Sequence, residues 1–191
     1  VPAGQGPSRQ HATPGDALYL TGTLGDSALG LKLRLDVGLA SRLGLSAAQT
    51  AFLHDRYLLP QPRLGLSQAL LGHARGAMDV SDGLVIDLDR MGRVSGTHGV
   101  VEFGRLPLSD AARAALAADP GLMTSILTGG DDYEVLCTVA PEGCVAFEAL
   151  AAEAGVAVAR IGRIEAGGRA PAILGADGRE LVPGGRGYAH F

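Results

Sequence analysis

Apolar residues follow two different spacings along the chain. Short apolar runs of the kind found in strands occupy Ala17–Thr21, Ala77–Val80, Gly99–Phe103, Tyr133–Val139 and residues 156–165. Between them, the three- and four-residue spacing of helices predicts one helix capped by Asp26 or Ser27, one from Ser46 to before Pro60, one over Leu64–His73, one capped by Ser81 or Asp82 and ending near Val94, one over Ser109–Ala118 and one over Pro141–Glu153. This alternation of strands and helices predicts a layered α/β (α+β) domain.

The two ends of the chain have a different character. Residues 1–15 are rich in Pro, Gly and polar residues and are predicted to form a linker. Because the chain starts with Val1 rather than Met, we expect it to be the C-terminal part of a longer protein, with residues 16–191 forming one domain. Near the other end, Ala176, Asp177 and Gly178 predict the turn of a hairpin.

The composition narrows the class of protein. Hydrophobic residues make up 47% of the 191 residues, which is enough for a substantial core, and the formal net charge is −4. There is no basic stripe of the kind that binds nucleic acid. The apolar runs are also shorter than the ~20 residues that span a membrane. We therefore expect a soluble cytoplasmic protein that binds neither nucleic acid nor membrane.

The stretch "AMDVSDGLVIDL" (residues 77–88) places three carboxylates in an apolar run. Asp79 and Asp82 flank Ser81 at the end of a predicted strand, and such hard oxygen ligands are the kind that Mg²⁺ takes together with phosphate and water. The following helix could also direct N–H groups at a phosphate. The alternative is that Ser81 or Asp82 only caps the helix. We expect Asp87 on the solvent-facing side of that helix.

A second acidic stretch, "TGGDDYE" (residues 128–134), clusters three carboxylates around a Gly pair that permits a tight turn with positive φ. The alternative is a polar turn before a strand, since turns often contain Gly and Asp. Lys32 is the only lysine. Cationic help to a phosphate would therefore have to come from Arg, backbone N–H groups or a metal. Arg9 is one candidate, because a planar guanidinium suits a phosphate.

Together, these segments resemble one family. "RQHATPGDALYLTGTLGDSALGL", "AMDVSDGLVIDL", "GRLPLS", "LTGGDDYEVLCTV", "IGRI" and the terminal "GYAHF" stand in the order seen in thiamine-monophosphate kinases, from about Arg9 to the end of the chain. The resemblance implies the C-terminal domain of the aminoimidazole ribonucleotide synthetase-like fold, a mixed sheet packed against helices. It also implies ATP- and Mg²⁺-dependent conversion of thiamine monophosphate to thiamine diphosphate.

The resemblance further implies roles for individual residues. Asp79 and Asp82 would be Mg²⁺ ligands, and Arg9 and Ser81 would contact ATP. Asp131 and Phe191 would contact the substrate, with Asp132 a less certain neighbour. Ala189 departs from the family, which usually has an acid there. No residue is assigned to covalent chemistry, because phosphoryl transfer depends mainly on alignment and neutralised charge.

The family also has an N-terminal domain that this chain does not contain. That domain contributes further metal-binding aspartates and most of a homodimer interface, so we expect the chain on its own to be inactive. Two other interpretations stay open. The chain could come from a sister enzyme such as aminoimidazole ribonucleotide synthetase or selenophosphate synthetase. It could also be a non-catalytic domain that keeps only the fold.

Overall fold

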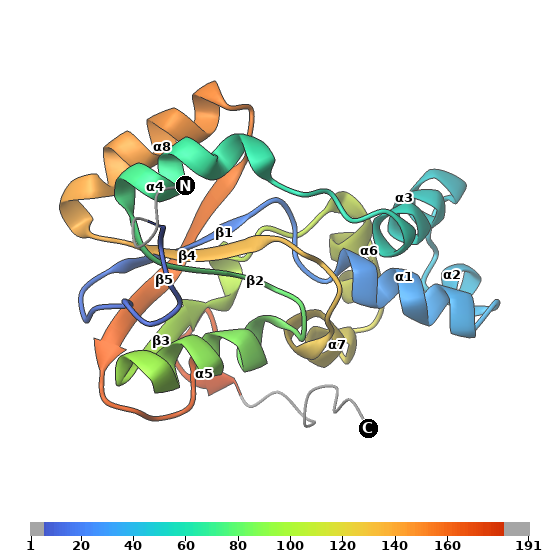
Figure 1. The fold of residues 1–191 in the computed structure, drawn as a ribbon. Coiled ribbons are helices and arrows are strands. Elements are labelled where there is room, and N and C mark those ends of the chain that lie inside the picture. Colours follow the sequence, from blue (N-terminus) through green and yellow to red (C-terminus); the bar gives the residue numbers. More distant parts are fainter. Residues whose placement is uncertain (1–5, 182–191) are drawn as a thin grey trace.

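The computed structural model describes residues 6–181 and contains one seven-stranded sheet with helices on both faces (Figure 1). The strands are β1 (Ala17–Thr21), β2 (Ala74–Asp79), β3 (Thr97–Glu102), β4 (Val135–Val139), β5 (Val158–Ala166), β6 (Ala172–Leu174) and β7 (Glu180–Leu181). Their order in the sheet is β2-β4-β1-β5-β3-β6-β7. Within the described residues, β3 and β6 pair in parallel and the other neighbours pair antiparallel. The predicted mixed sheet is confirmed.

The helices form two covering layers and a cluster at one end of the sheet. They are α1 (Asp26–Leu35), α2 (Leu39–Arg42), α3 (Ala47–Leu58), α4 (Ser67–His73), α5 (Leu84–Ser95), α6 (Asp110–Ala118), α7 (Leu122–Thr128) and α8 (Cys144–Glu153), with 3₁₀ turns at Leu64–Leu66, Phe103–Arg105 and Pro141–Gly143. Helices α4 and α8 lie over one face, α5 lies over the other, and α1, α2, α3, α6 and α7 gather at one end (Figure 1). None of the described helices is long and apolar enough to cross a bilayer.

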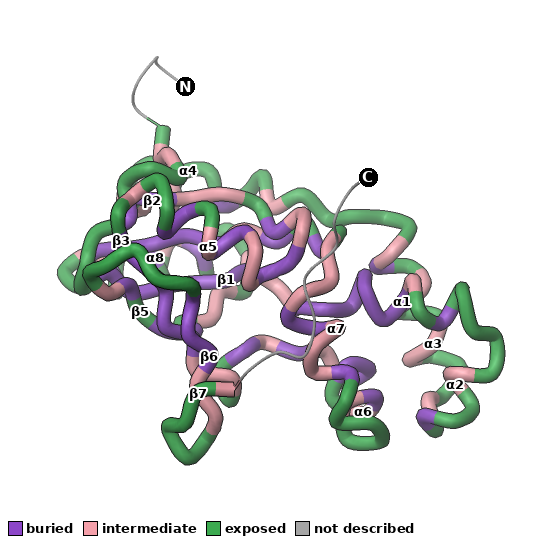
Figure 2. Tube along the Cα trace, turned by 90° about the horizontal axis from the view of Figure 1, so that it is seen from below, coloured by how far each residue is buried: buried purple, intermediate pink, exposed green. Residues whose placement is uncertain are grey.

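The central strand β1 explains why both faces need a helical layer. All five of its residues are buried, and successive side chains point to opposite faces of the sheet (Figure 2). Leu18 and Leu20 pack in the larger core cluster with residues of α1, α5, α6 and α7. Ala17 and Tyr19 pack in a second cluster with α4 and α8, where the Tyr19 and Phe147 rings are 5.1 Å apart. Fully buried strands of this kind require cover on both sides.

Most predicted elements are present, and two helix starts follow the sequence signals directly. Ser46 and Gln49 form a reciprocal capping box at α3, and the Ser109 side chain accepts the Ala112 N–H at α6. The pattern did not predict α7, whose seven residues include three Thr and Ser side chains. Residues 6–15 contain no helix or strand, although Ala12 is buried. Their role as a linker stays a prediction.

A buried ion-pair cluster ties the helical end to the sheet. Glu134, just before β4, is fully buried. Its carboxylate accepts hydrogen bonds from Arg56 Nη2 at 2.7 Å, from Arg63 Nε at 2.7 Å and from Arg63 Nη2 at 2.5 Å. The Thr21 hydroxyl donates to the same carboxylate at 2.6 Å and accepts the Val135 N–H at 2.7 Å. One side chain thus joins α3 and the segment after it to the ends of β1 and β4.

Glu134→Gln is expected to lower the free energy of unfolding by about 3 kcal/mol, because it keeps the shape of the side chain but leaves Arg56 buried without its counter-ion. Urea unfolding followed by circular dichroism measures the change. Asp36→Asn, which removes the partner of Arg42 at an exposed pair, serves as the control and should unfold close to wild type. Equal stability of wild type and Glu134→Gln would contradict this account.

Candidate functional site

The two acidic stretches singled out in the sequence lie side by side. Val80 N donates to Glu134 O at 2.8 Å, Tyr133 N donates to Val80 O at 2.9 Å, and Asp131 N donates to Ser81 O at 3.0 Å. These bonds continue the antiparallel pairing of β2 with β4, which ends at Asp79 opposite Val135. About fifty residues of sequence separate the two stretches, and these backbone hydrogen bonds hold them together.

The two glycines in "TGGDDYE" act differently from the prediction. Positive φ angles occur at Asp131 (67°) and Tyr133 (51°), and not at Gly129 or Gly130. The expectation of a positive-φ Gly turn was therefore wrong. These glycines instead allow close approach. A Cβ at Gly130 would lie 2.2 Å from Ser81 O, and a Cβ at Gly129 would lie 2.3 Å from the Ala28 Cβ. Any side chain there would push the two acidic stretches and α1 apart.

Side chains in the segment 131–134 alternate between surface and interior. Asp131 and Tyr133 are exposed, whereas Asp132 and Glu134 are buried. Asp132 accepts the N–H of Gly25 at 2.6 Å and of Ser27 at 3.0 Å, so it binds the N-terminus of α1 from a distant part of the chain. Burial raises the pKa of Asp132 to about 7, against the opposite effect of these two hydrogen bonds.

The predicted cap of α1 by Asp26 or Ser27 was wrong. The helix begins at Asp26 after Gly25, which occupies the cap position, and the Asp132 carboxylate supplies the missing acceptor. Asp26 is itself buried and accepts hydrogen bonds from the hydroxyls of Thr23 and Ser109, both at 2.5 Å. Sequence spacing could not reveal this, because the capping side chain lies more than a hundred residues away.

Asp87 corrects a second expectation. Instead of facing solvent, it is fully buried. Its Oδ2 accepts the N–H groups of both Ser81 and Asp82 at 2.9 Å, and its Oδ1 accepts from Arg90 at 3.0 Å. Burial raises the pKa of Asp87, and the two backbone hydrogen bonds oppose that rise. Neither Ser81 nor Asp82 caps α5; an acid inside the first turn of α5 instead holds the loop that carries both residues.

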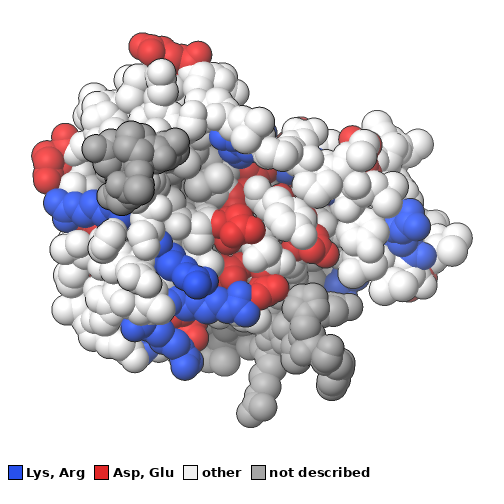
Figure 3. Space-filling model, in the orientation of Figure 1, with Lys and Arg blue, Asp and Glu red and all other residues white. Residues whose placement is uncertain are grey.

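The remaining acids meet on the surface. Asp79 is exposed at the end of β2, and Asp82, 17% exposed, pairs with Arg90. The Tyr133 hydroxyl donates to Asp131 Oδ1 at 3.2 Å. The charge of Asp131 raises the pKa of Tyr133, as do burial and the more distant charges of Asp79 and Asp82. The charges of all three carboxylates therefore raise the pKa of this one hydroxyl. Acidic side chains gather in the middle of the face of the molecule shown in Figure 3.

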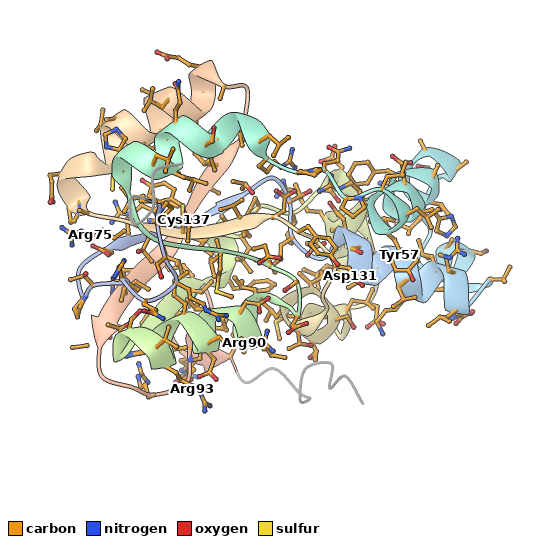
Figure 4. All side chains as sticks on the ribbon, viewed as in Figure 1. Tyr57, Arg75, Arg90, Arg93, Asp131 and Cys137 are labelled. Carbon is orange, nitrogen blue, oxygen red and sulfur yellow. The ribbon has the colours of Figure 1, made fainter. Side chains whose placement is uncertain are left out.

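A cavity of about 530 Å³ opens beside these acids. The lining contributed by α1 and α3 is largely apolar, and the lining contributed by the loop after β2, the end of α7 and residues 129–131 is more polar. Tyr57 and Asp131, both labelled in Figure 4, line this cavity. The lining residues are Ser27, Ala28, Leu31, Lys32, Leu35, Tyr57, Ser81, Asp82, Ser125, Thr128, Gly129, Gly130 and Asp131.

The carboxylates suit a hard divalent cation only as part of a larger ligand set. Asp79 and Asp82 offer oxygen ligands near each other in sequence and at the same surface, as Mg²⁺ requires. Within residues 6–181, no group of three or more His, Cys, Asp or Glu side chains is arranged to hold a metal by itself. A Mg²⁺ ion here would therefore need further ligands, such as phosphate oxygens, water or carboxylates from outside residues 6–181.

The remaining predicted site residues come from the two ends of the chain. Arg9 is exposed, and its carbonyl oxygen accepts the Ser95 hydroxyl at 3.2 Å, which puts its backbone beside the C-terminal end of α5. Phe191 and Ala189 lie outside the described residues. Sequence reasoning did not single out Tyr133 or Arg90, which both contact the predicted carboxylates.

Asp87→Asn is expected to lower the free energy of unfolding by about 1–3 kcal/mol and to speed amide exchange at Ser81 and Asp82, because a neutral amide accepts their N–H groups more weakly. Hydrogen exchange followed by NMR measures both effects. Asp89→Asn, two residues on along α5, removes a carboxylate that pairs with Arg93 at 2.7 Å and should leave both amides unchanged. Faster exchange in both variants would argue against the proposed role of Asp87.

The stability of the chain should depend on Asp132 and on pH. Burial raises the pKa of the folded Asp132 carboxyl to about 7, whereas the pKa of an unfolded Asp is ~4. Between these two pH values the folded state therefore binds more protons than the unfolded state. The contribution of this group therefore falls as the pH rises through that window. Relative to Asp132→Asn, wild type should lose roughly 2 kcal/mol of unfolding free energy from about pH 5 to about pH 8. Parallel pH profiles from urea unfolding would refute the assignment.

Comparison with known proteins identifies the domain. A family model described as "AIR synthase related protein, C-terminal domain" matches residues 13–174. A thiamine-monophosphate kinase of Caulobacter vibrioides is 40% identical over 193 residues, which cover 100% of this chain and 52% of that protein. The resemblance to the thiamine-monophosphate kinases is confirmed by such relatives, and the chain spans about half the length of the curated relatives it matches.

Solved structures agree with this result. The thiamine-monophosphate kinase of Stenotrophomonas maltophilia K279a superposes with a TM-score of 0.77 at 34% identity, over 95% of this chain and 56% of that one. A structure described as "AaThiL complexed with AMPPCP and TMP" also has a TM-score of 0.77, at 28% identity, over 97% of this chain and 54% of that one. From the matched family model, the fold and these relatives together, the chain belongs to the AIR synthase related proteins, as a C-terminal domain of that family.

Proposed function

We propose that this chain is the C-terminal half of an enzyme that uses ATP and Mg²⁺ to phosphorylate thiamine monophosphate to thiamine diphosphate. The observation that carries the proposal is the agreement between site and relatives. The two acidic stretches of this chain meet beside a cavity. A solved relative that superposes over 97% of the chain is described as complexed with AMPPCP, an ATP analogue, and TMP.

The polar side of the site suits the phosphate end of the reaction. Phosphoryl transfer requires aligned reactants and neutralised charge more than covalent help from the protein. Asp79 and Asp82 would hold Mg²⁺, which when bound neutralises charge on the transferred phosphoryl group. Ser81 lies between them on a loop fixed by Asp87, and this supports its role in contacting ATP. Arg9 is the proposed guanidinium partner of the ATP phosphates.

The cavity suits the organic end of the substrate. Thiamine monophosphate combines flat rings, one of them cationic, with an anionic phosphate. The apolar lining from α1 and α3 gives the rings a surface to pack on, and the Asp131 carboxylate, which lines the same cavity, offers an acceptor and a negative charge. Tyr133 fixes the direction of that carboxylate through its 3.2 Å hydrogen bond. Phe191 is the second proposed substrate contact.

The wider properties of the enzyme belong to the same proposal. The chain alone carries only part of the proposed ligand set, so we expect the 191-residue chain to lack turnover. The complete enzyme is proposed to be a cytoplasmic homodimer that associates through the half missing here, with residues 1–15 as the linker to that half. The net charge of −4 and the absence of a membrane-spanning helix among the described residues are compatible with this view.

Asp79→Asn and Asp82→Asn in the full-length protein are each expected to lower turnover of thiamine monophosphate by about a hundredfold or more, because each removes negative charge from the metal–phosphate site. The assay measures formation of thiamine diphosphate from thiamine monophosphate, ATP and Mg²⁺. Asp55→Asn, an exposed acid on α3, is the matched control and should keep wild-type turnover.

Two outcomes would overturn this proposal. Full activity in both variants, with circular dichroism unchanged, would remove the acids from the reaction. Wild-type protein that does not phosphorylate thiamine monophosphate, but turns over an aminoimidazole precursor or a selenium substrate with ATP, would indicate a sister enzyme. No activity on any of these would favour a non-catalytic domain.

A further inference from the structure

Arg90 occupies one of the carboxylates proposed to hold the metal. On α5, its Nη1 pairs with Asp82 Oδ2 and lies 3.0 Å from Asp87 Oδ1. The Arg90 side chain is 47% exposed and Asp82 17%, so water reaches this pair, whereas Asp87 is fully buried. Arg90 lies near the acidic centre of the face on which Figure 3 shows basic side chains beside acidic ones (Figure 4).

The two carboxylates that Arg90 contacts are held very differently. Asp87 accepts the N–H groups of Ser81 and Asp82 and is enclosed by the core, so it cannot move without breaking the loop. Asp82 stands at the surface of that loop and lines the cavity. Arg90 can therefore exchange its contact with Asp82 while Asp87 keeps the guanidinium beside the site.

A divalent cation that binds Asp82 must compete with this guanidinium. Arg90 binds Oδ2 of the Asp82 carboxylate, and two positive groups on one carboxylate repel each other over a few ångströms. An exposed ion pair adds little to the stability of a fold. The Arg90–Asp82 contact is therefore expected to change the affinity of Asp82 for a cation more than the stability of the fold.

We propose that Arg90 is a built-in competitor for the divalent cation at Asp82, and that displacement of its guanidinium sets the Mg²⁺ concentration at which the site fills. Before Mg²⁺ binds, Arg90 neutralises the charge of Asp82, while Asp87 holds the loop through the N–H groups of Ser81 and Asp82. When Mg²⁺ takes the carboxylate, Asp87 retains the guanidinium next to the site. This inference rests on the proposed function, since it assumes that Asp82 is a metal ligand.

The chain provides a matched control for this proposal. Arg93 lies three residues further along α5 and pairs with Asp89 at 2.7 Å, so Arg93→Gln makes the same change of charge on the same helix without touching Asp82. Isothermal titration calorimetry with Mg²⁺ alone, without nucleotide, gives the dissociation constant for wild type, Arg90→Gln, Arg93→Gln, Asp82→Asn and the double variant Asp82→Asn/Arg90→Gln. Thermal melts with and without Mg²⁺ provide a second readout.

Arg90→Gln is expected to bind Mg²⁺ about two- to fivefold more tightly than wild type, the range that corresponds to removing a partly exposed ion pair. Arg93→Gln should bind as wild type does. With Asp82 replaced, the further change of Arg90 to Gln should have no effect on Mg²⁺ affinity. Arg90→Gln should also show a larger rise in melting temperature on addition of Mg²⁺.

Each other outcome counts against the inference in a distinct way. Equal affinities in wild type and Arg90→Gln, or weaker binding in Arg90→Gln, would overturn competition while leaving the metal role of Asp82 standing. Equal tightening in Arg90→Gln and Arg93→Gln would show a general effect of net charge. Absence of Mg²⁺ binding in both wild type and Arg90→Gln, also when the titration is repeated with a saturating non-hydrolysable ATP analogue that supplies phosphate oxygens, would remove the metal role of Asp82 from the proposed function, and the competition with it.

Discussion

The carboxylate of Glu134 is the contact on which the arrangement of the site most depends. Its acceptance of three Arg hydrogen bonds and one Thr hydroxyl fixes the point where α3, β1 and β4 meet. The carbonyl oxygen of the same residue accepts a hydrogen bond from Val80 N, where the loop after β2 begins. Because a buried ion of this kind is strongly destabilising once its partner is removed, the cluster stabilises a single geometry rather than a range of them. This geometry fixes the position of the two acidic stretches relative to each other.

Six carboxylates around the site divide into two kinds according to what they bind. Asp87, Asp132 and Glu134 are buried, and their partners are backbone N–H groups or arginines of the fold. Asp79, Asp82 and Asp131 face the surface or the cavity. The buried set determines where the backbone of the exposed set lies. This division explains how so many acids can stand close together, because hydrogen bonds and arginines compensate the charges of the buried set.

Local signals predicted the local part of the fold. Ser46 and Ser109 lie next to the N–H groups they accept, so their helices could be predicted from neighbouring residues alone. Asp132 and Glu134 act across more than seventy residues, and their partners have no spacing that a single sequence reveals. Asp87 was placed on the wrong side because an acid in an apolar helix usually faces water. The letters "DDYE" do not reveal which residues are buried, because the structure buries the acids Asp132 and Glu134 and exposes the aromatic Tyr133, against the usual hydrophobic pattern.

The left-handed backbone at Asp131 limits which side chains can replace it. Few residues other than Gly adopt that conformation readily, and Asp and Asn are among those that do, because their short polar side chains bond locally. A β-branched residue at this position would strain the backbone, which Asp132 and Glu134 anchor from the other side of the segment. The backbone conformation alone therefore favours small polar residues at position 131, before any requirement of ligand binding is considered.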